Sequence, residues 1–289
     1  MFIATLIAKE RLSGGDISAA RDAVGGGAGL EWVEPERACD LLLGPEPGSA
    51  RAALERMLPG VDVVVQPQAS RRRRLLVADM DSTMITVECI DELADYAGVK
   101  AQVADVTEQA MRGELDFEGA LDARVALLKG LAAGAVDRCH DERVRLTPGG
   151  RALVGTMRAH GAYCLLVSGG FTLFADRVAA AIGFDEARAN DLHVADGLLT
   201  GTVGRPIIGA EAKRRALLEV AETRGIAVAD SLAVGDGAND VPMQQAAGLG
   251  NAYHAKPAAA AAADARIEAN DLGAILFAQG YARKDWVAD

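Results

Sequence analysis

Two aspartates, Asp79 and Asp81, are separated by one residue and directly follow the apolar run Leu75–Ala78. In an extended chain, residues i and i+2 point to the same side. Two carboxylates ~4 Å apart repel each other by ~4 kcal/mol at an effective dielectric constant of 20, so either a cation binds them or one keeps a proton. Magnesium prefers oxygen ligands of this kind, and a protonated carboxyl can act as a general acid. Read alone, the pair also fits an acidic surface turn.

A second acidic group follows the apolar run Leu232–Val234. Residues 235–240 read GDGAND and contribute Asp236, Asp240 and the amide of Asn239. The glycines allow the backbone to approach a ligand or a metal closely. A turn held by side-chain hydrogen bonds is the alternative for this segment.

Two further segments could bind an anion. Ser168-Gly169-Gly170 follows the apolar run Cys164–Val167 and precedes a predicted helix, whose free amides, together with the serine hydroxyl, suit a phosphoryl group. Lys213 lies in the first turn of another predicted helix, on the same stripe as Leu217 and Val220. A lysine there opposes the helix dipole, which is favourable when its ammonium holds an anion. An ordinary loop and a solvated lysine are the alternatives.

The elements that must position these side chains form an α/β pattern. The three short runs are apolar at every position, which is typical of parallel strands covered by helices on both faces. Predicted helices lie between them, one from Thr147-Pro148 to Gly161 and one from Phe171 to Ile182. Because ligands bind beyond the carboxyl ends of the strands in an open sheet, we expect all four polar segments at one edge.

A helical insertion separates the first two strands. Residues 90–146 carry helical patterns punctuated by glycine, and we expect them to form a small cap after the first core strand. In the helix that begins at Phe117, Arg124 falls on the apolar stripe with Leu121 and Leu128 and should face inward. An arginine whose stem covers the core while its head reaches water is the alternative.

The first 70 residues predict a small α+β domain. Strand-like and helical segments alternate through residues 2–8, 18–24, 30–43, 49–58 and 61–65. The polar segment Gln66–Ser70 ends this domain, and the four arginines Arg71–Arg74 are expected to be a solvated strand start. We therefore expect domains at 1–70 and 71–289, with the cap at about 90–146 of the second.

Composition narrows the function classes. The chain has 289 residues with 41 acidic and 30 basic side chains, a net charge of −11 that disfavours nucleic-acid binding. Its four cysteines show no paired spacing, so a disulfide framework and a structural zinc site are not expected. The apolar Met1–Ala8 is too short for a leader and reads as a strand, and no run reaches the ~20 residues of a membrane helix. We expect a cytoplasmic protein without membrane partners.

Taken in order, the motifs resemble those of the haloacid-dehalogenase superfamily, and within it the phosphoserine phosphatases. The resemblance covers residues 75–289 and rests on DMDSTMI, ECIDELADYAG, GELDFEGALDARVALLKG, LVSGGF and VGDGANDVPM. It implies a Rossmann-like core with a parallel sheet and a small helical cap. Residues 1–70 resemble the ACT-like, ferredoxin-like domain found ahead of some members.

The resemblance also implies a mechanism, the hydrolysis of O-phosphoserine as the last step of serine biosynthesis. Asp79 would be the nucleophile that forms an aspartyl phosphate, and Asp81 would be the general acid and then the base. Magnesium would be held by Asp79, the backbone carbonyl of Asp81 and Asp236. The phosphoryl group would be bound by Ser168, Gly169 and Lys213, with Asn239 and Asp240 in support.

The same resemblance places substrate selection in the cap. Glu88 would pair with the substrate ammonium, Arg124 would grip its carboxylate, and Phe117 would close over the site. Val241 stands where family members often have leucine, a difference that should affect packing alone.

Other functions remain open. The chain could be another phosphatase of this superfamily, or a phosphotransferase that passes the group to a second alcohol. A phospho-receiver also places an aspartate beside magnesium, but Asp81 and the helical insertion argue against one. An amino-acid sensor with a ligand at the N-terminal domain is a further alternative. A homodimer is a possible assembly of the chain under any of these functions.

Overall fold

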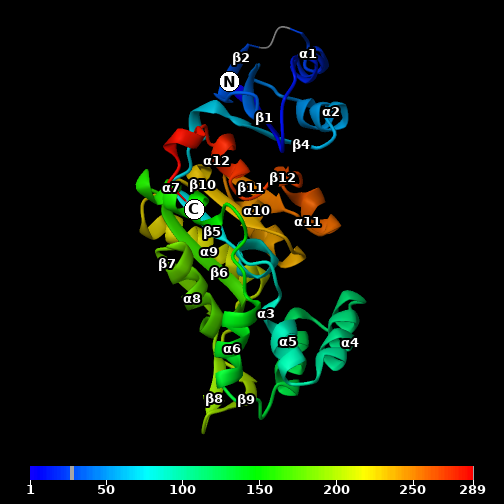
Figure 1. Cartoon of the computed structure of the whole chain (residues 1–289), viewed down its shortest axis with the longest axis vertical. Helices are drawn as coiled ribbons and strands as arrows, with labels where there is room; N and C mark the ends of the chain where they lie inside the picture. Colours follow the sequence, from blue (N-terminus) through cyan, green and yellow to red (C-terminus); the bar gives the residue numbers. More distant parts are fainter. Residues whose placement is uncertain (27–28, 289) are drawn as a thin grey trace.

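The computed structural model describes residues 1–26 and 29–288 of the chain, and Figure 1 shows three parts stacked along the long axis. At one end lies a four-stranded antiparallel sheet with strand order β2-β3-β1-β4. Its elements are β1 (Phe2–Ala8), α1 (Gly14–Ala23), β2 (Leu30–Glu34), β3 (Ala38–Leu43), α2 (Ala50–Met57) and β4 (Val61–Pro67). The small α+β fold expected for residues 1–70 is confirmed.

This antiparallel sheet is buried on both faces. Alternate residues of β1, Ala4 and Leu6, pack with Ala20 of α1 and Leu54 of α2 in a core of their own. The opposite face, which includes Ile7, joins the core of the rest of the chain. The N-terminal sheet therefore packs onto the larger part of the chain through this face, where apolar side chains such as Ile7 lie beside buried polar contacts such as that of Gln66 with the carbonyl of Ala278.

The central part is a six-stranded parallel sheet with order β12-β11-β10-β5-β6-β7. Its strands are β5 (Leu75–Ala78), β6 (Tyr163–Phe171), β7 (Glu186–Asn190), β10 (Ser231–Gly235), β11 (Leu249–Tyr253) and β12 (Ala265–Ile267). Leu76 and Ala78 of β5 point into one core, while Leu75 and Val77 point into another. This two-sided burial is why the predicted strands are apolar at every position.

Helices cover both faces of the parallel sheet. One face carries α7 (Gly150–Ala159), α8 (Thr172–Ile182) and α12 (Ala274–Ala278), and the other carries α9 (Ala210–Thr223) and α10 (Val241–Ala246). The short α11 (Pro257–Ala262) follows β11. The expected start of α7 at Thr147-Pro148 is wrong, because its N-cap is Gly149, whose φ of 79° is left-handed. A Cβ at Gly149 would lie 2.4 Å from the backbone nitrogen of Gly273, so only glycine fits there.

The third part is the helical cap, and it follows β5 as expected. It contains α3 (Cys89–Tyr96), α4 (Lys100–Met111), α5 (Phe117–Leu127) and α6 (Gly134–Arg143). Asp116 caps α5, since its side chain accepts a hydrogen bond from the amide of Gly119 at 2.8 Å.

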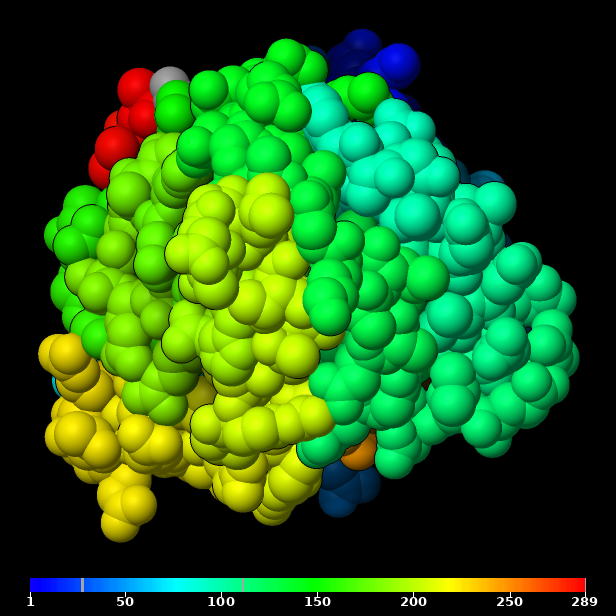
Figure 2. Space-filling model, turned by 90° about the horizontal axis from the view of Figure 1, so that it is seen from below, coloured from blue at the N-terminus to red at the C-terminus, as the bar shows by residue number. Residues whose placement is uncertain are grey.

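A β-hairpin that sequence reasoning missed completes the cap. Strands β8 (Leu192–Ala195) and β9 (Leu198–Val203) form a two-stranded antiparallel sheet. The hairpin is tied to the segment after α5, because the amide of Gly130 donates to the carbonyl of Leu199 and the amide of Leu199 donates to the carbonyl of Leu131. Figure 2 shows the hairpin lying against the cap. Its turn residues Asp196 and Gly197 both have positive φ, as a tight hairpin requires.

The arginine run at residues 71–74 joins the N-terminal sheet to the core. Arg71 makes two hydrogen bonds to Asp40 of β3, at 2.6 and 3.1 Å, and also reaches the carbonyl of Ala278 in α12. Arg73 is 3% exposed and donates to Gln66 at 2.7 Å. The expectation of a solvated strand start is wrong for these two residues, because buried carbonyl and carboxylate groups from both parts of the chain meet there.

Candidate active site

The four polar segments meet at the carboxyl edge of the parallel sheet. Strand β5 lies between β10 and β6; Asp79 follows β5, Gly235 ends β10, and Ser168 lies near the end of β6, which runs to Phe171. The amide of Asp79 donates to the carbonyl of Val234 at 2.9 Å, which continues the ladder one residue beyond β5. The expectation that sheet topology brings these segments together is confirmed.

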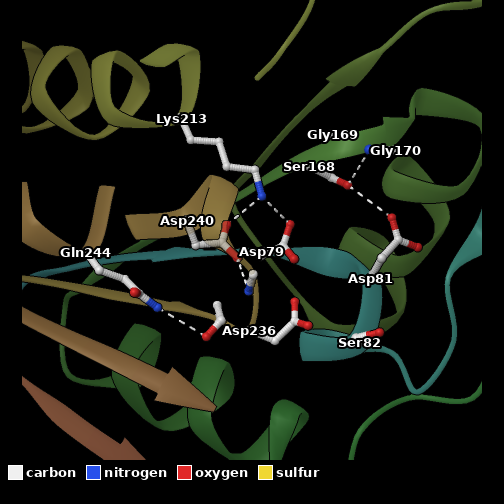
Figure 3. A network of polar contacts seen from close by, with 12 residues as sticks. Asp79, Asp81, Ser82, Ser168, Gly169, Gly170, Lys213, Asp236, Asp240 and Gln244 are labelled. Atoms are coloured by element: carbon white, nitrogen blue, oxygen red, sulfur yellow. Dashed lines mark hydrogen bonds and ion pairs between the residues drawn. The ribbon is translucent and has the colours of Figure 1, made fainter. Parts of the chain in front are cut away.

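Lys213 lies between two of the carboxylates. Its side chain is 0% exposed, and its Nζ donates to Asp79 and, at 2.7 Å, to Asp240 (Figure 3). Burial alone would lower the pKa of Lys213, but the charges of Asp240 and Asp79 outweigh it and raise that pKa. The lysine is therefore a fixed cation beneath the site, as its place on the stripe of α9 indicates.

Asp79 and Asp236 are buried carboxyl groups in an acidic setting. Burial, followed by the charge of Asp240, raises the pKa of Asp79 well above its ordinary value, while Lys213 opposes the shift. Burial is also the main cause that raises the pKa of Asp236. Three carboxylates against one buried ammonium leave a formal excess of negative charge, which a further cation would relieve.

Asp240 is held in place by the turn that follows β10. Its Oδ2 accepts a hydrogen bond from the amide of Gly237 at 3.0 Å. A Cβ at Gly235 would lie 2.4 Å from the carboxyl group of Asp240, so this close approach requires glycine. Gln244 donates to the carbonyl of Gly235 at 3.1 Å and ties the turn to α10 (Figure 3).

Asp81 points away from this cluster, toward β6. The turn Met80–Met84 carries it past the strand end, and its Oδ1 accepts from the amide of Cys89 at 3.0 Å. Its Oδ2 lies 3.4 Å from the hydroxyl of Ser168. Burial, together with the charge of Glu88, raises the pKa of Asp81 to about 6, so the carboxyl group can carry a proton near neutral pH.

Ser168 and its two glycines line the opposite side. The hydroxyl of Ser168 accepts a hydrogen bond from the amide of Gly170 at 2.8 Å. A Cβ at Gly170 would lie 2.6 Å from Asp81, and one at Gly169 would lie 3.0 Å from Phe117. Both glycines therefore permit close approach of other groups. Strand β6 continues through them to Phe171, and α8 begins at Thr172, one residue later than expected.

These groups open into a cavity of about 510 Å³ between the core and the cap. The predicted residues on its wall are Asp79, Asp81, Glu88, Phe117, Arg124, Gly169, Asp236 and Asn239. Ser168, Lys213 and Asp240 are fully buried just behind that wall. The structure therefore brings all the predicted site residues to one place.

The cap contributes charges of both signs. Glu88, just before α3, accepts a hydrogen bond from Ser82 at 2.8 Å. Arg124 of α5 is partly buried and donates through Nε to the carbonyl of Ala120 at 3.1 Å. Burial lowers the pKa of Arg124, and the charges of Asp91, Glu88 and Asp81 oppose that shift. The inward direction expected for Arg124 is confirmed.

Sequence reasoning missed two features of the cavity. Lys256, at the start of α11, lies 3.5 Å from Asp236 through its Nζ, and its amide donates to the carbonyl of Asp236 at 3.0 Å. It follows β11, a strand that sequence reasoning did not identify, although Pro257 marks the helix start. The second feature is an apolar cap wall formed by Ile90, Ala110, Leu115 and Leu121.

The carboxylates fit a divalent cation. Asp79, Asp236 and Asp240 each offer an oxygen atom, and these atoms lie within 4.8 Å of one another. All three residues are buried, and carboxylate oxygen is the donor type preferred by hard cations. The cluster can thus hold a metal ion. The Asp81 carboxylate does not belong to this cluster, so of the two alternatives that the sequence leaves open for the Asp79–Asp81 pair, the geometry favours a proton on Asp81 over a cation shared by both carboxylates.

No helix within the described residues is long and apolar enough to cross a membrane.

Comparison with known proteins places the chain in a family. Residues 76–245 match the model of the haloacid dehalogenase-like hydrolases. A phosphoserine phosphatase of Streptomyces coelicolor is 44% identical over 242 residues, which cover 83% of this chain and 59% of that protein. One of Polaromonas sp. is 50% identical over 189 residues, covering 64% of this chain and 80% of that protein. The chain thus spans about three fifths of the length of the first relative and four fifths of the second.

A solved structure shares the whole architecture. The structure described as a probable phosphoserine phosphatase from Vibrio cholerae superposes with a TM-score of 0.80 at 33% sequence identity, covering 98% of this chain and 87% of that one. The family model spans more than half of the chain and includes both the strand end at Asp79 and the turn at Asp240. The chain belongs to the haloacid dehalogenase-like hydrolase family.

Proposed function

We propose that this protein is a magnesium-dependent phosphomonoesterase that hydrolyses O-phosphoserine to serine and phosphate. The observation that carries this proposal is the pairing of a buried Asp79, held by Lys213, with a second carboxyl, Asp81, whose raised pKa lets it carry a proton. The names of the relatives and the charged groups of the cap support the choice of substrate.

The first chemical step uses both aspartates. A carboxylate oxygen of Asp79 attacks phosphorus, the bond from phosphorus to the serine oxygen breaks, and that oxygen takes the proton of Asp81. The product is serine together with an aspartyl phosphate on Asp79. Asp81 is suited to this role because it lies on the β6 side of the site, apart from the carboxylates that face Lys213.

The second step reverses the role of Asp81. Its carboxylate takes a proton from water as the water oxygen attacks phosphorus, and the bond from phosphorus to Asp79 breaks. Phosphate is released, and Asp79 and Asp81 return to their starting states. Ser168, the amide of Gly169, Asn239 and the ammonium of Lys213 would bind the phosphoryl oxygens throughout.

We assign the cation as Mg²⁺, held by Asp79, the backbone carbonyl of Asp81 and Asp236, with Asp240 in support. A bound magnesium ion supplies charge neutralisation for the phosphoryl oxygens. Lys213 and Lys256 reduce the repulsion among the carboxylates but leave them in formal excess, consistent with a site for a cation.

Substrate selection would come from the cap. Glu88 would bind the ammonium group and Arg124 the carboxylate of the substrate, while Phe117 closes over the phosphoryl site. The two charged groups lie on the wall of the same cavity as Asp79, as a zwitterionic ester requires. A reaction in the last step of serine biosynthesis follows from this substrate, and a cytoplasmic location stays a prediction.

We also propose that the domains are residues 1–70 and 71–289, with the cap at about 90–146. The separate core of the N-terminal sheet supports the first boundary. The ACT-like identity of that domain, an amino-acid ligand there and a homodimer stay predictions.

A panel of phosphate esters tests the proposed function. The full chain with added magnesium is given O-phospho-L-serine, O-phosphothreonine, 3-phosphoglycerate and p-nitrophenyl phosphate, each with and without an acceptor alcohol. We expect the highest kcat/KM for O-phosphoserine, with equal amounts of serine and phosphate released. Equal activity on all esters, or less phosphate than serine when the acceptor is present, would favour a general phosphatase or a phosphotransferase.

A further inference from the structure

Ser82 holds a backbone conformation that glycine adopts more easily. Its φ of 56° and ψ of 4° lie in the left-handed region, where a side chain clashes with its own backbone. The other described non-glycine residues with positive φ are Glu36, Asp196 and His254, whereas Ser82 directly follows Asp81, which lines the cavity. A serine in this position costs free energy relative to glycine, and strain of this kind is concentrated beside functional groups.

The hydroxyl of Ser82 makes one specific contact. It donates a hydrogen bond of 2.8 Å to Oε1 of Glu88, and both side chains are partly buried. Within the described part of the chain, Ser82 is the residue that donates a hydrogen bond to this carboxylate. Glu88 lies at the N-cap of α3 but makes no side-chain capping bond, so its own helix does not fix its direction.

The backbone around the two residues is closed into a short loop. The amide of Ser82 donates to the carbonyl of Val87 at 3.2 Å, and the amide of Cys89 donates to Asp81 at 3.0 Å. These two bonds fix both ends of the segment that joins Ser82 to Glu88. The left-handed turn at Ser82 therefore places the hydroxyl at a defined position relative to the carboxylate.

We propose that Ser82 is a positioning residue that holds one oxygen of Glu88, so that the other is directed to the ammonium group of an α-amino phosphate ester. This rests on the proposed function, in which Glu88 binds that group. A glutamate side chain has several rotamers, and a hydrogen bond from a fixed donor reduces them before substrate arrives. Ser82 itself touches neither phosphorus nor the leaving oxygen in this account.

The proposal predicts a selective loss of specificity. Ser82→Ala keeps the Cβ and removes the hydroxyl, while Ser82→Gly removes both the hydroxyl and the backbone strain. Each should lower kcat/KM for O-phosphoserine about tenfold, mainly through KM, as expected for a hydrogen bond to a charged group. 3-Phosphoglycerate has a hydroxyl where phosphoserine has the ammonium, so it does not use the charged contact with Glu88. Activity on this ester should therefore change less than about twofold. Ser82→Gly should be at least as thermally stable as the parent.

A double-mutant cycle with Glu88→Gln separates this proposal from the function on which it rests. If Glu88→Gln lowers activity equally on both esters, the ammonium role of Glu88 fails, and the positioning role fails with it. If Glu88→Gln is selective, Ser82→Ala should cost much less in that background than in the parent, which supports the proposal. Full additivity of the two changes, an equal loss on both esters in Ser82→Ala, or full preference retained in Ser82→Gly would each overturn it.

Discussion

Lys213 donates a hydrogen bond to Asp79 although the two residues are 134 positions apart in the sequence, and neither side chain is more than 7% exposed. Helix α9 and the end of β5 bring them together at the floor of the cavity. A buried lysine with no partner would lose its proton readily, whereas here two carboxylates keep it charged. The pair therefore stabilises the site, and it holds the ammonium in the place where the proposed function needs a cation for the phosphoryl group.

Replacing Lys213 by methionine should damage both properties. Lys213→Met keeps the length of the side chain but leaves Asp79 and Asp240 buried without their cation, at a cost of about 3–5 kcal/mol in the free energy of unfolding. Turnover should fall at least roughly a hundredfold, because the cation proposed to bind the phosphoryl oxygens is lost. Denaturant unfolding in the presence of a chelator measures the first effect, with the exposed Lys284→Met as control. Unchanged stability would show that the ion pairs do not hold the site together.

Arg124→Ala should alter specificity more than catalysis. Its guanidinium lies on the wall of the cavity beside Glu88 and Asp81, where it can make a bidentate contact with a carboxylate. We expect kcat/KM for O-phosphoserine to fall by about one to two orders of magnitude, as for a lost hydrogen bond to a charged group. Phosphoethanolamine, which lacks the carboxylate, should be affected far less. Equal losses on the two esters would contradict the assignment.

A methyl group at Gly170 should displace Asp81, the residue proposed as the general acid and base. The added Cβ would lie 2.6 Å from Oδ2 of Asp81 and 3.1 Å from Oγ of Ser168, so at least one of these side chains must move. We expect Gly170→Ala to lower kcat by roughly a hundredfold, because misplacing a catalytic group by about 1 Å has costs of this size. Gly134→Ala is the matched control, since its Cβ would meet nothing within 4 Å. Parallel kinetic and thermal measurements on the two variants check this, and full activity of Gly170→Ala would show that the site tolerates the shift.

The cysteines should be unreactive in the folded protein. All four are buried and free, and burial raises the pKa of Cys39 to about 12 and that of Cys139 to about 11. Because the thiolate is the reactive form, raising the pKa by about two units lowers the reactive fraction at pH 8 roughly a hundredfold. The residual rate should keep rising with pH beyond 9, where an ordinary thiol levels off.

Thiol titration with a chromogenic disulfide checks this prediction. The native protein at pH 8 should react slowly, and the protein unfolded in guanidinium chloride should yield four thiols per chain. Rapid reaction of one or more thiols in the native state would mean that the packing around them opens easily.

The sequence predicted the sheet edge because burial on both faces leaves a clear pattern. Leu75 to Ala78 point alternately into two cores, so the strand is apolar throughout and its end is marked by Asp79. The inward direction of Arg124 and Lys213 followed from helical periodicity in the same way. Such local patterns show which face of a helix or strand is buried, even when the element that packs against it is unknown.

What escaped prediction depends on distant parts of the chain. Arg73 can be buried because its guanidinium donates hydrogen bonds to Gln66 and to the carbonyl of Ala229. The contact with Ala229 joins segments far apart in the sequence, so no local pattern predicts it. The β8–β9 hairpin does carry a local signal, the Asp-Gly turn at residues 196–197 between two strand-like segments. Asp81 turns toward β6 because the strand ends before it, so the alternation assumed for the two aspartates does not apply.

The most direct test of the account follows phosphorus onto Asp79. The protein is mixed with magnesium and ³²P-labelled O-phosphoserine, quenched in acid within the first turnovers, digested, and the labelled peptide is sequenced. We predict an acyl phosphate on the peptide that contains Asp79, released by hydroxylamine and absent from Asp79→Asn, which should also lack turnover. Label on another residue, or undiminished turnover in Asp79→Asn, would contradict the central claim that Asp79 is the nucleophile.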